Sequence, residues 1–277
     1  MIERIMNSTE ENVDEIIKTI INELDNKANK VERLGFLDSI SSNPVYKGFI
    51  PLNTRIKYSN FGVEDYSMKT TDFIYEFIKN IKKYNLTNKG QIIHFLEYYI
   101  NTYFGLPGGI SRETLFNDIA WNTTTTDDEY FAALEKNEIG MLKNKRAAQC
   151  TERSAVAQQI LSVLGFETFY CMGCVDLGNN HQEPHCFNII KRKNDYALVD
   201  YSCPITEYNE DNSVRAYYPF IATLSNDEFT DFLNNGVIKS FTNYSYEIKN
   251  GKSVRIDDDS SRSYVVGQYE IKKENQK

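Results

Sequence analysis

The clearest guide to the fold is the segment 144–204, along which helix-type and strand-type patterns alternate with short breaks between them. An apolar-periodic run begins just after Cys150 and ends at Gly165, a residue type that commonly follows the last turn of a helix. Runs with strand character follow at 166–175, 185–190 and 196–200. The segment therefore predicts loop, helix, strand, loop, strand, turn and strand, in that order.

Three side chains with catalytic potential stand at the ends of these elements. Cys150 opens the helix, His185 opens the second strand and Asp200 closes the third. At a helix N-terminus, unpaired N–H groups and the helix dipole favour an anion. A neighbouring imidazolium can then lower a thiol pKa from about 8.5 to roughly 3.5–7.5. We therefore expect Cys150 to be a thiolate nucleophile at neutral pH.

The spacing between His185 and Asp200 fits a single hairpin with its turn at 191–195. In such a hairpin residues 185 and 200 would lie opposite each other, so the carboxylate could hydrogen-bond to the imidazole. We expect His185 to take the thiol proton and later to protonate the leaving group. Asp200 would hold the ring in the required tautomer and orientation.

The order of these three residues resembles that of the transglutaminase-like superfamily. The resemblance is carried by C-x-E-x-S/A-x-x-A on the helix (150–157), H-x-F-N on a strand (185–188) and a hydrophobic strand that ends at Asp200. It covers about 60 residues, from the approach to Cys150 as far as Pro204. It implies a papain-like core and a triad of Cys150, His185 and Asp200.

The resemblance implies amide chemistry more firmly than it implies a substrate. The superfamily includes transglutaminases, deamidases, peptidases, peptide:N-glycanase-like amidases and members that have lost activity. The expected reaction is attack of Cys150 on an amide carbonyl, giving a thioester that water or an amine resolves, without a cofactor or a metal. The acyl donor would be a peptide, a protein or a small amide.

The stabilisation of the oxyanion is the least defined part of the expected site. Many superfamily members place a Trp or Gln donor before the cysteine, which makes Trp121 and Gln149 the side-chain candidates. The backbone N–H of Cys150, at the start of its helix, is a further candidate. Losing one such donor typically raises the barrier by about 2.7–4 kcal/mol.

Plainer interpretations compete with catalysis. A free cysteine is most often a small buried hydrophobe, but the polar neighbours of Cys150 favour an accessible position (Gln149, Thr151, Glu152 and Arg153). A second histidine, His181, lies in a polar loop, whereas a catalytic base is better held on a rigid element. A catalytically silent protein that keeps the fold and uses the cleft for binding is the main alternative.

A zinc site is the other alternative. Cys171-x-x-Cys174 is followed by His181 and His185, which superficially resembles a zinc-ligand arrangement. However, the two cysteines fall in a strand-type run, where an offset of three residues sends side chains to opposite faces. We therefore expect no metal site.

The overall pattern predicts an α+β fold, with the Cys150 helix packed on an antiparallel sheet and a mainly helical N-terminal half. Residues 1–140 are expected to pack on a catalytic core at 141–272, followed by a frayed tail at 273–277. Helices are expected around 13–24, 73–81, 88–104, 112–119 and 127–134. Ser8 and Glu11 form a capping-box pattern before the first of these helices, and residues 34–65 are expected to be irregular.

The residues after Pro204 are expected to extend the sheet. Strand patterns occur at 213–222, 241–248 and 263–271, with a polar loop at 249–262. A helix capped by Ser225 is expected between the first two of these strands.

The charge and cysteine content bear on the partners and the compartment. The net charge of −8, without a basic block, argues against nucleic acid or an anionic membrane as a partner. No apolar run approaches the roughly 20 residues of a membrane helix, and the first residues lack the apolar core of a signal peptide. Five cysteines without a regular framework favour free thiols. We expect a bacterial, cytoplasmic protein.

Overall fold

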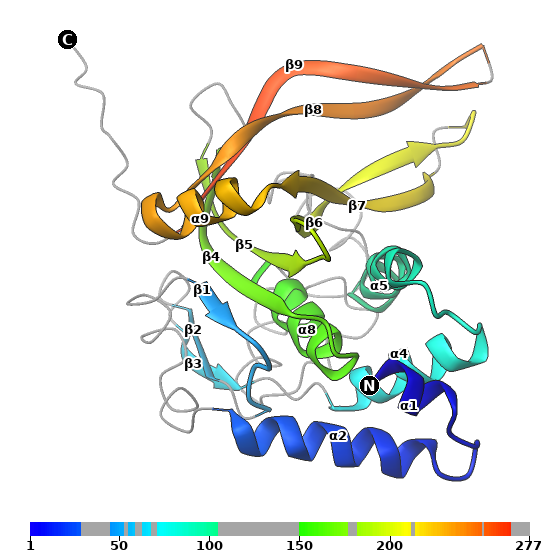
Figure 1. Ribbon diagram of the computed structural model, residues 1–277. Coiled ribbons are helices and arrows are strands. Elements are labelled where there is room, and N and C mark those ends of the chain that lie inside the picture. The colour runs from blue at the N-terminus through cyan, green and yellow to red at the C-terminus, as the bar shows by residue number, and fades with distance from the viewer. Residues whose placement is uncertain are drawn as a thin grey trace.

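A curled antiparallel sheet with helices on both faces forms the centre of the molecule (Figure 1). The computed structural model describes residues 1–28, 45–52, 55–58, 63–67, 71–104, 150–176, 182–211, 214–250 and 252–266. The expected α+β class is therefore observed in this part of the chain.

The bounds of the elements are as follows. The helices are α1 (Ile2–Met6), α2 (Val13–Lys27), α4 (Thr71–Lys83), α5 (Lys89–Phe104), α8 (Cys150–Val163) and α9 (Asn226–Asn235). The strands are β1 (Val45–Lys47), β2 (Arg55–Tyr58), β3 (Val63–Ser67), β4 (Thr168–Asp176), β5 (Gln182–Lys191), β6 (Tyr196–Tyr208), β7 (Val214–Leu224), β8 (Val237–Lys249) and β9 (Lys252–Val266).

The sheet has the strand order β7-β6-β5-β4-β9-β8, and all of its strand pairs are antiparallel. The outer edge of β4 is shared by two strands. β1 pairs with its residues 169–171, and β9 pairs with its residues 173–176. This sharing leaves only β4 between the C-terminal strand β9 and β5, which carries His185.

Helix α8 lies between the sheet and the N-terminal helices (Figure 1). It is buried along almost its whole described surface because the sheet covers one side and α2 and α4 lie against the other. Apolar residues of α1, α2, α4, α5 and α8 share one continuous core with the facing side chains of β4, β5 and β6. The N-terminal helices therefore enclose the helix that begins with Cys150.

Polar side chains of α8 fix its position. Gln158 donates from its amide to the carbonyls of Gly48 and Thr168, at 2.8 and 2.9 Å, and accepts from the Thr168 hydroxyl at 3.0 Å. Gln159 donates to the carbonyl of Ile50 at 3.0 Å. Both glutamines are fully buried, so each of these bonds satisfies a group that water cannot reach.

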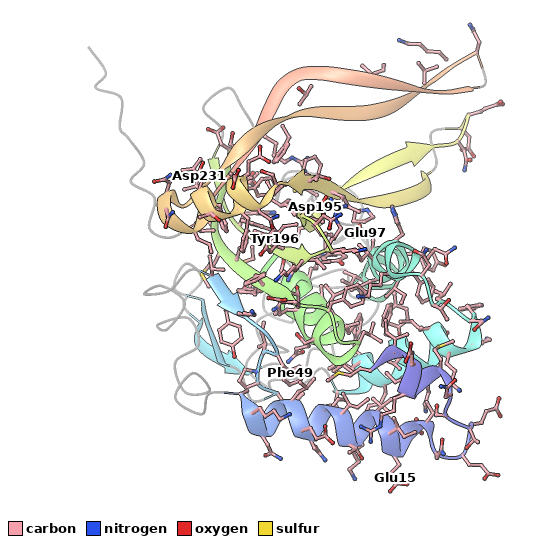
Figure 2. All side chains as sticks on the ribbon, viewed as in Figure 1. Glu15, Phe49, Glu97, Asp195, Tyr196 and Asp231 are labelled. Carbon is pink, nitrogen blue, oxygen red and sulfur yellow. The ribbon has the colours of Figure 1, made fainter. Side chains whose placement is uncertain are left out.

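A second core fills the space between the other face of the sheet and α9. Tyr196 lies beneath α9 (Figure 2) and stacks on Phe229 with ring centroids 3.8 Å apart. The predicted cap of this helix is confirmed, because Ser225 and Glu228 form a reciprocal capping box. Gly236 ends the helix with a φ of 73°.

The predicted helices around 13–24, 73–81 and 88–104 are confirmed as α2, α4 and α5. The Ser8–Glu11 capping box is wrong, because α2 begins at Val13 and the Ser8 hydroxyl donates instead to the carbonyl of Ile5. The helices expected at 112–119 and 127–134 and the tail at 273–277 lie outside the described residues.

The expectation that residues 34–65 are irregular is wrong for the described part of this range, whose strands make the N-terminal half less purely helical than predicted. This region holds β1, β2 and the start of β3, and β1 belongs to the central sheet. Pro51 lies after β1, in a described stretch outside any helix or strand. A proline breaks a helix, but it is compatible with short strands beside it.

The polar loop expected at 249–262 is also wrong. β8 and β9 form a long hairpin that pairs Lys249 with Lys252 and extends away from the body of the sheet (Figure 1). Asn250 has a φ of 52°, and Asn-Gly is the strongest short-range signal for a tight hairpin turn. The strand expected at 263–271 therefore begins earlier, at Lys252; it is described as far as Val266, and residues 267–271 lie outside the described residues.

We predict that Gly173→Ala will weaken the contact between β4 and β9. A Cβ at this position would lie 1.8 Å from the carbonyl oxygen of Val265, so the backbone of β9 would have to move. Overpacking of this kind costs about 1–3 kcal/mol in the free energy of unfolding. The midpoint of urea denaturation, followed by circular dichroism, measures the loss.

Gly90→Ala is the matched control, because Gly90 lies in the first turn of α5 and faces only the side chain of Asn88 at 3.2 Å. It should be neutral or slightly stabilising, since Ala favours helix over Gly by up to about 1 kcal/mol. Equal denaturation midpoints for the two variants would show that the approach of β9 to β4 is not tight.

Candidate active site

His185 and Asp200 form a buried pair at the centre of the sheet. The Nε2 atom of His185 lies 2.8 Å from Oδ2 of Asp200. The histidine is 5% exposed and the aspartate is fully buried. A hydrogen bond of this length between a carboxylate and an imidazole fixes which ring nitrogen carries the proton toward the acid.

The hairpin that carries this pair is confirmed, but the predicted register, with residues 185 and 200 directly opposite each other, is wrong. β5 and β6 pair Lys191 with Tyr196 and Asn188 with Val199, so His185 and Asp200 are not directly opposite. The ladder ends at Asn188, and the pairing of β6 with β7 is irregular just after Asp200. The two side chains meet diagonally across the strands, within the reach of a histidine.

Four groups of the described residues hydrogen-bond to Asp200, and the His185 ring is one of them. The backbone N–H groups of Ser202 and Cys203 donate to Oδ1 at 2.9 and 3.1 Å. The hydroxyl of Tyr264 donates to Oδ2 at 2.8 Å, on the same oxygen that contacts His185. Burial by itself raises the pKa of Asp200, but the charge of His185, assisted by Arg262 and the N–H of Ser202, holds it well below its usual range. Asp200 is therefore ionised across the neutral range.

Cys150 stands at the first residue of α8 and is half-buried. Its Sγ lies 3.9 Å from the carbonyl oxygen of Pro184, the residue before His185. Two bonds hold this end of the helix on β5. The Ser154 hydroxyl donates to the carbonyl of Cys186 at 2.8 Å, and the Asn188 amide donates to the carbonyl of Ser154 at 3.1 Å. Ser154 and Asn188 both belong to the motifs that carry the superfamily resemblance.

The thiol and the imidazole are close enough to affect each other's protonation. His185 lowers the pKa of the Cys150 thiol, and Cys150 raises that of the His185 ring. Because Nε2 of His185 faces Asp200, Nδ1 is the nitrogen left for the sulfur. The arrangement therefore joins Cys150, His185 and Asp200 in one chain of contacts.

The expectation of a low thiol pKa is wrong for this state of the protein. The contact with the Cys186 thiol, together with burial, raises the pKa of Cys150 well above its ordinary value, and His185 only partly opposes this effect. Burial alone would lower the pKa of His185, but Asp200, together with Cys150, raises it to about 10. At neutral pH the site therefore holds a thiol beside an imidazolium.

Cys186 was not anticipated as part of the site. It lies one residue after His185, and it is almost fully buried. Its sulfur accepts from the Tyr170 hydroxyl at 3.1 Å and lies 3.6 Å from the Thr151 hydroxyl. Side chains alternate between the two faces of a strand, so Cys186 points to the face opposite that of His185, toward α8. This alternation could have been read from the sequence once α8 was assigned to that face.

The sequence argument for an accessible Cys150 rested on a wrong premise. Its polar neighbours Thr151 and Arg153 are themselves buried, although Cys150 is partly accessible. Trp121 and Gln149, the candidate oxyanion donors, and His181, the rival histidine, lie outside the described residues.

The five cysteines all fall within the described residues and form no disulfide. Cys171 packs into the core beneath α9, and strand alternation directs Cys174 to the other face of β4. A different group, His185, Asp200 and Cys203, brings its ligand-type atoms within 4.8 Å of one another. In that group the imidazole and the carboxylate already bond to each other, and the Arg262 guanidinium lies alongside.

Comparisons with protein-family models, with curated protein sequences and with solved structures found no match for this chain. Among the described residues no helix combines the length and the apolar character needed to cross a membrane.

We predict that Asp200→Asn will lower the pKa of His185 far below its present value of about 10, because burial would then be opposed only by the contribution of Cys150. The ring resonances of His185, followed by NMR against pH, give this value directly. His94, on the outer face of α5, is the internal control and should titrate identically in both proteins.

The same substitution should change stability in a defined pH window. The raised pKa of His185 stabilises the fold below about pH 6.5, and that contribution disappears as pH rises toward 10. The lowered pKa of Asp200 stabilises the fold above about pH 3.8, and that contribution disappears in acid. The destabilisation by Asp200→Asn should therefore be largest between these pH values, and a pH-independent difference would contradict the pairing.

We predict that Cys186→Ala will lower the pKa of the Cys150 thiol, because the contact that contributes most to raising it would be removed. The rate of Cys150 alkylation by iodoacetamide, measured against pH by mass spectrometry, should show its midpoint at a lower pH. Cys174→Ala removes a different buried thiol and should leave that midpoint in place. An unchanged midpoint in Cys186→Ala would exclude this thiol as the cause.

Proposed function

We propose that this chain is a cysteine-dependent hydrolase or acyltransferase of the transglutaminase-like type, acting on an amide bond. Cys150 would be the nucleophile, His185 the proton carrier and Asp200 the group that orients the ring. The observation that carries the proposal is the chain of contacts from the Cys150 thiol through the His185 imidazole to Asp200. This is the relationship among nucleophile, base and orienting group that covalent acyl transfer requires.

In the proposed reaction the resting site must first lose one proton. The resting site holds a thiol and an imidazolium, whereas the reactive pair is a thiolate and an imidazolium. Loss of the thiol proton would leave a sulfur anion at the N-terminus of α8, where the helix dipole stabilises it. Activity is therefore expected to rise with pH until the imidazolium itself loses its proton.

The bond changes follow from that state. The sulfur attacks the amide carbonyl, and the tetrahedral oxyanion forms beside the first turn of α8. His185 gives its proton to the leaving nitrogen as the C–N bond breaks, which leaves a thioester. Water or an amine, deprotonated by the neutral ring, then attacks the thioester and releases an acid or a new amide; the sulfur leaves as the thiolate, so the pair of thiolate and imidazolium is restored.

The placement of the motif residues supports a papain-like core for this site. Ser154, four residues after Cys150, and Asn188, three residues after His185, bond to each other across the helix and the strand. This contact holds the sulfur and the imidazole in a constant relation. It gives the motif residues a physical role that does not depend on the identity of the substrate.

For the remaining roles the proposal relies on the resemblance. The backbone N–H of Cys150 and a side chain from Trp121 or Gln149 are the proposed oxyanion donors, and the substrate is a peptide, a protein or a small amide. A bacterial cytoplasm, where free thiols persist, is the proposed compartment.

A catalytically silent binding protein is the second candidate. It is favoured by the raised pKa of Cys150, which describes a thiol that is poorly nucleophilic in the resting state. A zinc-binding role has weaker support. A metal at His185, Asp200 and Cys203 would have to break the 2.8 Å bond and lie close to the Arg262 cation.

The deciding experiment compares the wild-type protein with Cys150→Ala on a peptide library that contains Gln side chains, with and without an added amine. Mass spectrometry distinguishes cleavage, deamidation and transamidation. Loss of the nucleophile should reduce product formation by several orders of magnitude. Cys174→Ala controls for the loss of an unrelated buried thiol and should keep full activity.

Equal product from the wild-type protein and Cys150→Ala would remove Cys150 from the mechanism. No product from either protein over the range from pH 6 to about 10, combined with tight binding of a library peptide, would favour the silent binding protein. Near-stoichiometric zinc in the purified protein would favour the metal alternative.

A further inference from the structure

Tyr264 of β9 contacts the site from a distant part of the sequence. Its hydroxyl donates to Oδ2 of Asp200 at 2.8 Å, across a separation of 64 positions. This is the oxygen that also faces Nε2 of His185. The phenol is fully buried, so its donor has no access to water. Burial and the nearby carboxylate raise the pKa of Tyr264 far above its usual value, so the hydroxyl keeps its proton and remains a donor.

Arg262 orients this hydroxyl from two residues earlier on the same strand. Its Nη1 donates to the Tyr264 oxygen at 3.3 Å and to the carbonyl of Cys203 at 3.2 Å. Its guanidinium lies 4.3 Å from the centroid of the Phe220 ring, which favours one position for the cation. The Tyr264 ring is held edge-on against Phe187, with centroids 4.8 Å apart. Both ends of the tyrosine are therefore fixed.

The route of β9 through the sheet brings these residues to the pair. β4 pairs Gly173 with His185 on one side and with Val266 on the other. Tyr264 pairs with Val175, two residues farther along β4. Because residue 173 has no side chain, the backbone of β9 can lie close to β4 at this point.

The groups that surround the Asp200 carboxylate interact with it in different ways. His185 and Arg262 bring positive charge, the backbone N–H groups fix Oδ1, and Cys203 adds a buried thiol next to the carboxylate. The Tyr264 hydroxyl is the described side-chain donor that shares Oδ2 with the imidazole. Among the described residues, loss of this hydroxyl would leave Oδ2 held by the His185 ring alone, the group that Asp200 has to orient.

We propose that Tyr264, itself oriented by Arg262, is a positioning residue that fixes Asp200 and thereby holds the His185 imidazole in line with Cys150. The proposal rests on the proposed function for its catalytic meaning. The positional claim is separate and concerns only the geometry of the pair. A fully buried carboxylate held from both oxygens has one orientation, and a misplacement of about 1 Å in such a site can lower a rate by about 100-fold.

The test uses Tyr264→Phe, which keeps the ring against Phe187 and removes only the hydroxyl. Tyr201→Phe is the matched control. Tyr201 is equally buried and adjoins Asp200 in sequence, but its hydroxyl has no hydrogen-bond partner among the described residues. In proteins with ¹⁵N-labelled histidine, NMR measures the exchange of the His185 Nε2–H proton with water and the pKa of the ring.

In Tyr264→Phe the Nε2–H proton should exchange at least about tenfold faster, and the pKa of His185 should fall from its raised value, because Asp200 becomes free to turn. Tyr201→Phe should match the wild-type protein in both measurements. If both variants match the wild-type protein, the positioning role is wrong. A lower midpoint of unfolding without a change in the His185 signals would also overturn it, since it would show a structural role alone.

Arg262→Gln provides a second route if Tyr264→Phe does not fold. It removes the donor that orients the Tyr264 hydroxyl, so it should speed the exchange of the same proton by a smaller factor, and no change would count against the proposal. These measurements need no substrate. Equal amide activity in wild type and Cys150→Ala would therefore overturn the proposed function but not this inference. Unchanged His185 exchange and pKa in Tyr264→Phe would overturn this inference but not the proposed function.

Discussion

A carboxylate with no exposed surface is the constraint around which the candidate site is built. Removing an ionised group such as Asp200 from water is strongly unfavourable unless hydrogen bonds and opposite charge replace the lost solvation. Two backbone N–H groups, a tyrosine hydroxyl and an imidazole supply that replacement here. Each of these partners comes from a position that the sheet topology fixes, so the architecture and the electrostatics of the site depend on each other.

The position of the sulfur follows from a second set of buried polar contacts. α8 packs against apolar side chains of the sheet, and apolar packing alone would tolerate small shifts along the helix axis. The bonds of Ser154 with Cys186 and Asn188 at one end, and of Gln158 with Thr168 farther along, tolerate no such shift. A broken bond of this kind would leave a buried polar group unpaired, which costs about 1–3 kcal/mol. Cys150 is therefore held beside β5 by specific bonds as well as by packing.

The protonation of the site follows from the same burial. The charge of Asp200 keeps His185 positive, while Cys186 and the apolar surroundings keep Cys150 neutral. Acid–base catalysis is most efficient when the catalytic group has a pKa near the working pH. The pKa values of Cys150 and His185 both lie above the neutral range in this structure. A bound substrate that altered the contact between the two thiols, or the solvation of the ring, would bring the pair nearer to the reactive ion pair. The resting structure therefore describes an assembled but protonated site.

Much of this arrangement could be predicted from the sequence, because the signals are local. The period of apolar residues marked α2, α4, α5 and α8, strand patterns marked the hairpin of β5 and β6, and the ends of these elements singled out Cys150, His185 and Asp200. The register of the hairpin, the contact between Cys150 and Cys186, and the approach of Tyr264 and Arg262 were decided by the tertiary structure alone. The reason is physical: a residue's local pattern sets its element and its face. Which distant strand lies alongside, and therefore which charges and donors surround a buried group, depends on pairings such as that of β4 with β9, which bring together residues far apart in the sequence.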